Sequence, residues 1–266
     1  VKRFLALRDT VPAKPGLRRV VCAVHHHIAQ RPVVPDLQRG DRRAAVSTRP
    51  PSDYGRQVLP EVDLPEHRKA RGAFFTPPTV ARYVAEWAIR GPDDLILEPS
   101  CGEAAFLLAG AERLHALRGG GARPGQLTGV ELHEGSARAA EGVLAAVDAP
   151  ARIVTSDFFN FPARACYDAV VGNPPYVRYQ AFMGEARTAS QEAALAQGVR
   201  LSGLASSWAA FTVHAALFLK PGGRLGLVLP AELLSVNYAA QVRSFLMRRF
   251  GKVRLVLFNE RVFPGV

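Results

Sequence analysis

Short apolar segments alternate with longer segments of helical periodicity from about residue 78 to the end of the chain, and this alternation limits the fold most strongly. The apolar segments are residues 94–99, 127–132, 151–159, 167–173, 224–230 and 252–258. Parallel strands need long crossover connections, whereas antiparallel strands can be joined by tight turns. The pattern therefore predicts an α/β fold in which a parallel sheet is covered by helices on both faces.

The spacing of apolar residues also predicts helices between the strands. PTVARYVAEWAIR predicts the first helix, and Thr76 or Thr79 is expected to cap it. SSWAAFTVHAALFLK predicts a helix with a serine start, and residues 231–251 predict one further helix. Residues 177–205 form a polar stretch before the second of these helices.

The first 65 residues differ from the rest of the chain. They are rich in Arg and Pro, weakly periodic and punctuated by RPVVP and RPPSDYG. This composition predicts a loosely structured N-terminal extension over residues 1–65, followed by a folded domain over residues 66–266.

Charge and cysteine content narrow the functional classes. The formal net charge is +11, with much of the excess in the first 70 residues. This excess suits a nucleic-acid partner, but the Arg-rich extension explains it equally well. Cys22, Cys101 and Cys166 have no paired spacing, which argues against a disulfide framework or a zinc site and favours a reducing cytoplasm. No metal is predicted, and no apolar run approaches the ~18 residues of a membrane helix.

The unusual residues lie where the predicted strands end, which is where open α/β sheets bind ligands. The first strand ends in Glu98-Pro99-Ser100-Cys101-Gly102. A small, Gly-containing loop lets the backbone approach a ligand, and the following helix N-terminus favours an anionic group. A plain strand–helix turn is the alternative explanation.

The second and third strands end in acidic residues. Glu131 is placed to accept the ribose hydroxyls of a nucleoside cofactor. Asp157 can accept from an adenine amino group, and Phe158 offers a ring to lie against the base. Taken singly, a solvated loop carboxylate and a core Phe beside a turn Asp explain these residues as well.

The fourth strand stops at Asn173-Pro174-Pro175-Tyr176. The two prolines fix the backbone and leave carbonyl groups without local donors. The Asn173 side-chain oxygen and the Pro174 carbonyl can then accept from one amino group, while Tyr176 stacks on a planar ring. Two acceptors would free the lone pair of an aromatic amine, and holding that nitrogen beside an activated methyl group supplies proximity. A rigid Pro-Pro turn explains the tetrapeptide alone, but not the four strand ends together.

These segments, in this order, resemble the class I S-adenosylmethionine-dependent methyltransferases over about residues 70–266. The closest resemblance is to the gamma group of adenine-N6 DNA methyltransferases of restriction-modification systems. RGAFFTPPTVARYVAEW resembles the segment before the first strand of that family, LEPSCGEAAF its cofactor loop and NPPY its catalytic motif. The resemblance implies a Rossmann-like sheet and S-adenosylmethionine as cofactor, contacted by Thr76, Glu98, Ser100, Cys101, Gly102, Glu131, Asp157 and Phe158.

The resemblance also implies double-stranded DNA as substrate. NERVFPGV resembles the family segment whose aromatic residue, Phe263 here, packs with Tyr176 on a target adenine flipped out of the duplex. The catalytic residues implied are Asn173, Pro174, Pro175 and Tyr176. A cytoplasmic location, with no membrane partner, agrees with this function.

The chain departs from the family in two places. Glu103-Ala104-Ala105 stand where the family often has a second Gly. The family continues with another strand and a target-recognition domain, so the sheet is expected to lack its last strand and specificity to need a separate subunit or domain. The alternatives are a protein-glutamine N5-methyltransferase of release factors, which shares the NPPY loop, and a truncated, non-catalytic methyltransferase domain. A dehydrogenase is excluded, since no G-x-G-x-x-G follows the first strand.

Overall fold

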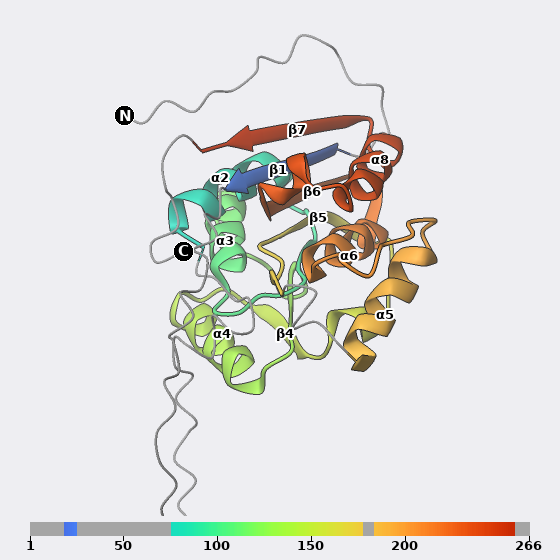
Figure 1. Cartoon of the computed structure of the whole chain (residues 1–266). Coiled ribbons are helices and arrows are strands. Elements are labelled where there is room, and N and C mark those ends of the chain that lie inside the picture. Colours follow the sequence, from blue (N-terminus) through green and yellow to red (C-terminus); the bar gives the residue numbers. More distant parts are fainter. Residues whose placement is uncertain (1–18, 26–75, 178–183, 259–266) are drawn as a thin grey trace, which may run out of the picture.

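The computed structural model describes residues 19–25, 76–177 and 184–258. Its strands form one seven-stranded sheet with the order β4-β3-β2-β5-β6-β1-β7 (Figure 1). The paired strands are parallel throughout. The strands are β1 (Arg19–His25), β2 (Ile96–Glu98), β3 (Leu127–Glu131), β4 (Ala151–Thr155), β5 (Tyr167–Gly172), β6 (Leu219–Pro230) and β7 (Lys252–Leu257).

Helices cover both faces of this sheet, as the alternation of strands and helices predicts (Figure 1). On one face lie α2 (Pro78–Ala88), α3 (Ala105–Arg118) and α4 (Glu134–Ala146). On the other lie α5 (Gly184–Leu195), α6 (Ser207–Ala215) and α8 (Ala239–Arg249), with the short α7 (Glu232–Ser235) before α8. Two short 3-10 turns, η1 (Phe158–Asn160) and η2 (Ala216–Phe218), complete the described elements.

Successive residues of the central strands point to opposite faces and so enter two separate cores. Ile96 packs with α2, α3 and α4, while its neighbour Leu97 packs in the core that contains α6 and α8. Val228 and Leu227 of β6 divide in the same way. Burial on both faces explains why these strands read as continuous apolar runs rather than as alternating ones.

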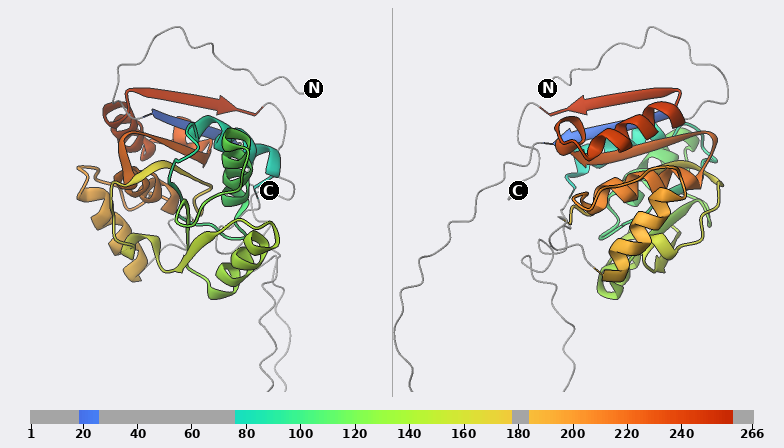
Figure 2. Two further views of the ribbon diagram at one scale, coloured as in Figure 1. Left: turned by 180° about the vertical axis from the view of Figure 1, so that it is seen from behind. Right: turned by 45° about the vertical axis from the view of Figure 1, so that its right-hand side comes forward.

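The N-terminal part of the chain contributes β1 to the sheet, which the sequence analysis did not predict. β1 lies between β6 and β7, with Val20 opposite Leu225 on one side and Val253 on the other. Figure 2 shows β7 beyond β1, at the border of the sheet. The sheet that was expected to lack a strand thus reaches seven strands through an N-terminal segment. The division at residues 65 and 66 stays a prediction, and β1 lies outside the domain it defined.

Two local expectations were wrong, and one helix was not predicted. The polar stretch contains α5, and the single helix expected over residues 231–251 is divided into α7 and α8. Pro77, not Thr76 or Thr79, is the N-cap residue of α2, and no side chain caps that helix. In the part of the chain that the structure describes, no helix is both long and apolar enough to cross a membrane.

Candidate functional site

Hydrogen bonds join the ends of β2, β3 and β5, and so bring the candidate residues together. The Gly102 amide donates to Glu131 Oε2 at 2.9 Å, which links the loop after β2 to the end of β3. The Ser100 hydroxyl donates to the Asn173 carbonyl at 3.3 Å, which links the same loop to the end of β5. The predicted cofactor loop and the predicted catalytic loop are therefore neighbours.

The loop between β2 and α3 has a strained backbone. Gly102 has φ +50° and Ala104 has φ +66°, both in the left-handed region. A left-handed conformation costs a residue with a side chain about 1–2 kcal/mol, whereas Gly adopts it readily. The departure seen in the sequence thus falls on a position that favours Gly, and Ala104 keeps the turn with its side chain fully buried.

Close packing below the loop depends on Gly129 of β3. A Cβ atom there would lie 2.9 Å from the Cys101 sulfur and 3.0 Å from Leu107 Cδ1. Cys101 is itself buried, and burial raises the pKa of its thiol well above the ordinary value. A thiol in this state packs as an apolar group and does not react.

Glu98 lies beneath the cofactor loop rather than on its surface. Only 2% of the residue is exposed, and its Oε2 accepts from the Leu107 amide in the first turn of α3 at 2.9 Å. Burial raises the pKa of this carboxyl well above its ordinary value, and the charge of Glu131 acts in the same direction. The arrangement favours a role in positioning the loop and the N-terminus of α3.

The Glu131 carboxylate is oriented by two backbone amides. Oε2 accepts from Gly102 and Oε1 accepts from His133, each at 2.9 Å. Each carboxylate oxygen can accept a further hydrogen bond. The side chain is therefore prearranged at the end of β3, where a pair of ligand hydroxyls could donate to it.

Asp157 and Phe158 follow β4 and differ in exposure. Asp157 Oδ1 accepts from the Phe159 amide at 2.9 Å and so caps η1, while no donor among the described residues reaches Oδ2. The Phe158 ring is 3% exposed and stacks on Phe218 at a centroid distance of 5.1 Å. Phe158 thus anchors this segment in the core, and its contact with a base stays a prediction.

The Asn173 amide at the end of β5 is held in one orientation. Its Nδ2 donates to the Thr76 hydroxyl at 3.2 Å, and its Oδ1 accepts from the Tyr176 hydroxyl at 2.6 Å. The same hydroxyl lies 2.9 Å from the Val228 carbonyl of β6. Burial raises the pKa of Tyr176 well above its ordinary value, so the phenol remains protonated and a donor.

Pro174 is buried, and no donor among the described residues reaches its carbonyl. The sequence predicted this acceptor because the prolines remove local donors. The Pro174 carbonyl directly follows Asn173, whose side-chain amide is held in one orientation. Two acceptors thus lie at the site, and Tyr176 occupies one of them.

Ser207 is a site residue that the sequence analysis missed. Its hydroxyl donates to the Pro175 carbonyl and accepts from the Val177 amide at 2.9 Å. The serine start of α6 was visible in the sequence, but a helix cap was the expected role. Phe263, the other residue predicted to contact the base, lies outside the described residues.

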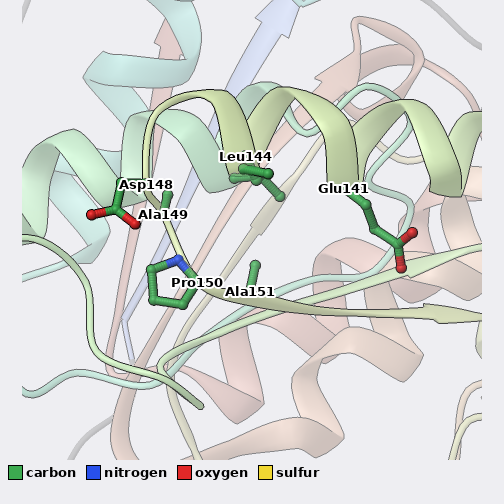
Figure 3. Close-up of a pocket in the computed structure, with 7 residues that line it drawn as sticks. Glu141, Leu144, Asp148, Ala149, Pro150 and Ala151 are labelled. Atoms are coloured by element: carbon green, nitrogen blue, oxygen red, sulfur yellow. The ribbon is translucent and has the colours of Figure 1, made fainter.

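A cavity of about 290 Å³ lies elsewhere, between the end of α4 and the start of β4 (Figure 3). Its lining includes Glu141, Leu144, Asp148 and Pro150. The start of β4 is at the opposite edge of the parallel sheet from the strand ends described above. This cavity therefore does not contribute to the candidate site.

Known proteins resemble this chain in sequence and fold. The type II methyltransferase M.XamI of Xanthomonas campestris pv. amaranthicola is 28% identical over 75% of this chain and 38% of its own length. M.HincII of Haemophilus influenzae is 26% identical over 73% of this chain and 35% of its own length. The chain thus spans less than half the length of these curated relatives.

Solved structures agree with the fold. The type I restriction-modification methyltransferase subunit from Streptococcus thermophilus has a TM-score of 0.54 and 21% identity, covering 66% of this chain and 38% of that protein. The type IIG restriction endonuclease BpuSI has a TM-score of 0.57 and 18% identity, covering 68% of this chain and 23% of that one.

The order of the strands in the sheet also agrees with the fold of class I methyltransferases. The first five strands that follow α2, β2 to β6, have the order 3-2-1-4-5 when counted along the chain, which is typical of class I methyltransferases. The family described as N-6 DNA Methylase matches residues 63–265, which include every described site residue. The chain belongs to the N-6 DNA methylase family.

Proposed function

We propose that this chain transfers a methyl group from S-adenosylmethionine to the N6 amino group of an adenine in double-stranded DNA. The observation that carries this proposal is the pair of acceptors, Asn173 Oδ1 and the Pro174 carbonyl, beside the loop that follows β2. An amino group that donates to both acceptors is held, and its lone pair is directed away from them. No nucleophilic side chain is needed for this reaction.

The residues that would hold the cofactor fit a nucleoside with a charged amino-acid end. Glu131 is oriented to accept from ribose hydroxyls, and Asp157 Oδ2 is available to an adenine amino group. The loop of Ser100, Cys101 and Gly102 and the N-terminus of α3 would receive the methionine end, together with Thr76. When bound, S-adenosylmethionine supplies an activated methyl group. Glu98 supports this loop from below.

The Tyr176 hydroxyl competes with the substrate for Asn173. Because it donates to Asn173 Oδ1 at 2.6 Å, an adenine amino group that uses this acceptor would share it with the phenol or displace the phenol. Displacement would release the phenol ring for stacking on the flipped base, together with Phe263. The binding of the base and the release of Tyr176 are thus coupled through one acceptor.

Several broader features belong to the same proposal. The reaction would serve a restriction-modification or related defence system in the cytoplasm. Double-stranded DNA is the proposed partner, and sequence recognition is assigned to a separate target-recognition domain or subunit. The catalytic unit is proposed to cover residues 66–266, with β1 added to its sheet.

Two substitutions test the assigned roles. Asn173→Ala should lower methyl transfer to DNA by at least about 100-fold and leave cofactor affinity unchanged, because its amide serves the target amine. Asp157→Ala should weaken cofactor binding first, since it removes an acceptor from the adenine pocket. Calorimetric titration of S-adenosylmethionine, followed by transfer of a labelled methyl group to unmethylated duplex DNA, measures both effects.

Asn237→Ala is the matched control, since Asn237 is exposed in the turn before α8. It should change neither quantity. Loss of cofactor binding in Asn173→Ala would contradict the role of the Asn173 amide. Transfer to a release-factor peptide, with none to DNA, would contradict the substrate assignment.

A further inference from the structure

Ser207, the first residue of α6, is hydrogen-bonded to the predicted catalytic loop on both sides of Tyr176. We propose that Ser207 is a positioning residue that holds the main chain of the Asn173–Tyr176 motif in its reactive geometry. This inference rests on the proposed function for its effect on methyl transfer. The contacts themselves are observed in the structure.

Three hydrogen bonds make up this connection. The Ser207 hydroxyl donates to the Pro175 carbonyl at 2.5 Å, and the Val177 amide donates back to that hydroxyl at 2.9 Å. The Ser207 amide donates to the Val177 carbonyl at 3.0 Å. One residue therefore fixes the peptide groups that precede and follow Tyr176.

The serine does not serve its own helix in the usual way. A serine at a helix start commonly accepts from the amides of the first turn. Here the N-cap residue of α6 is Ser206, and no side chain makes a capping hydrogen bond. The Ser207 hydroxyl is directed to the loop instead, and both its donor and its acceptor capacity are used there.

The anchor itself is rigid. Every residue of α6 is buried; Ser207 is 2% exposed, and the side chains of Trp208 and Thr212 are fully buried. Close packing of this kind leaves a helix little freedom to shift. A loop tied to its first residue is therefore placed relative to the core.

Ser207 also explains how Tyr176 can move without loss of the site. The neighbouring peptide groups are tied to α6, and Asn173 is tied to Thr76 and to the Ser100 side. The Tyr176 side chain can then rotate away from Asn173 while the main chain, with the Pro174 carbonyl, stays in place. The Pro-Pro pair adds stiffness between the two anchors.

Ser207→Ala tests this role, because it removes the hydroxyl and leaves the Ser207 amide. It should lower the single-turnover rate of methyl transfer by about 10- to 100-fold, as expected for a displaced reacting group, with unchanged cofactor affinity. Hydrogen exchange of the Val177 amide should become faster, since its acceptor is gone. Ser207→Thr keeps the hydroxyl and should restore a large part of the rate.

Thr212→Val is the matched control. Thr212 lies on the same buried helix, and its hydroxyl donates to the Trp208 carbonyl and not to the loop. This variant should keep the rate of transfer and the Val177 exchange of the wild type, even where its melting temperature falls. Equal losses of rate in both variants would show a merely structural role and overturn the proposal.

The two proposals fail in different ways. Unchanged Val177 exchange and an unchanged rate in Ser207→Ala would overturn the role of Ser207 and leave the function intact. A wild-type chain that binds the cofactor and methylates no DNA would overturn the function. In that case, unchanged Val177 exchange in Ser207→Ala would overturn the loop-holding role, and faster exchange would support it.

Discussion

The Asn173 amide is prearranged by its neighbours, and Tyr176 is the neighbour that can change. The Thr76 hydroxyl lies 3.2 Å from Nδ2 and the Tyr176 hydroxyl lies 2.6 Å from Oδ1, so both ends of the amide are hydrogen-bonded. The phenol and a substrate amine are both hydrogen-bond donors. The structure therefore shows the acceptor engaged with a donor of its own chain, in the role proposed for the substrate.

Tyr176→Phe should separate the two functions of this side chain. Removal of the hydroxyl abolishes the competition for Asn173 but keeps an aromatic ring for stacking, so kcat/KM for DNA should rise by about 2- to 10-fold, the worth of one hydrogen bond. The free energy of unfolding should fall by about 0.5–1.5 kcal/mol. Steady-state kinetics and urea denaturation measure the two effects.

Tyr238→Phe provides the comparison for Tyr176→Phe. The Tyr238 hydroxyl donates to Glu232 at 2.6 Å and not to Asn173. This variant should lose similar stability without a gain in kcat/KM. A fall in kcat/KM for Tyr176→Phe would mean that the hydroxyl assists the reaction instead of competing with it.

Residue types at strand ends could be predicted from the sequence, but their hydrogen bonds could not. Glu131 and Asn173 were predicted as site residues because polar side chains at the ends of apolar strands lie where such sheets bind ligands. The contact of Ser207 with Val177 joins residues that are 30 positions apart, and the burial of Glu98 depends on packing from both faces. Such contacts depend on the folded arrangement, which a local pattern does not contain.

At the level of elements, β1 is the strand that the sequence analysis did not find. Its apolar residues form a short run, Val20 to Val24, flanked by arginines at positions 18 and 19 and by histidines at positions 25 to 27. In the sheet it separates β6 from β7 and pairs with both. This run stands in an Arg- and Pro-rich part of the chain, without the alternation of strands and helices that identified β5 and β6.

A proline in β1 should expose this dependence. Val21→Pro removes a backbone donor from a strand that is paired on both sides, which leaves a ladder acceptor unsatisfied. The expected loss is about 2 kcal/mol of unfolding free energy, and about 4–8 °C in melting temperature for a domain of this size. Thermal unfolding followed by circular dichroism measures it.

Val21→Ala retains the backbone donor and controls for the loss of the side chain. It should cost less stability than Val21→Pro. If the two variants melted together with the wild type, β1 would not contribute to the sheet in solution.

At the scale of the whole molecule, parallel topology explains why the site is assembled from remote segments. All paired strands run in one direction, so the loops after β2, β3, β4 and β5 meet at one edge. The sequence predicted a site at this edge, because the candidate residues follow the predicted strands. The stability of the fold also depends on two buried titratable groups, Glu98 of β2 and His214 of α6.

Two buried groups should give the stability of the molecule opposite dependences on pH. Burial lowers the pKa of His214 below 6.5, although the Phe158 backbone and Asp157 oppose this shift. The contribution of His214 to the free energy of unfolding is therefore present above pH 6.5 and is lost as the pH falls through the folded-state pKa. Burial raises the pKa of Glu98 above 4.5. The contribution of Glu98 to the free energy of unfolding is therefore present at acid pH and is lost as the pH rises through the folded-state pKa. Between about pH 5 and 7 the two slopes have opposite signs.

Substitutions at the two positions should therefore change the pH dependence in opposite directions. His214→Leu should flatten the rise of unfolding free energy with pH, because the group that requires a neutral ring is removed. Glu98→Gln keeps an acceptor for the Leu107 amide and should make the rise steeper. Urea denaturation of the wild type and both variants at several pH values gives the slopes. Parallel curves for all three proteins would show that neither group titrates differently in the folded and unfolded states.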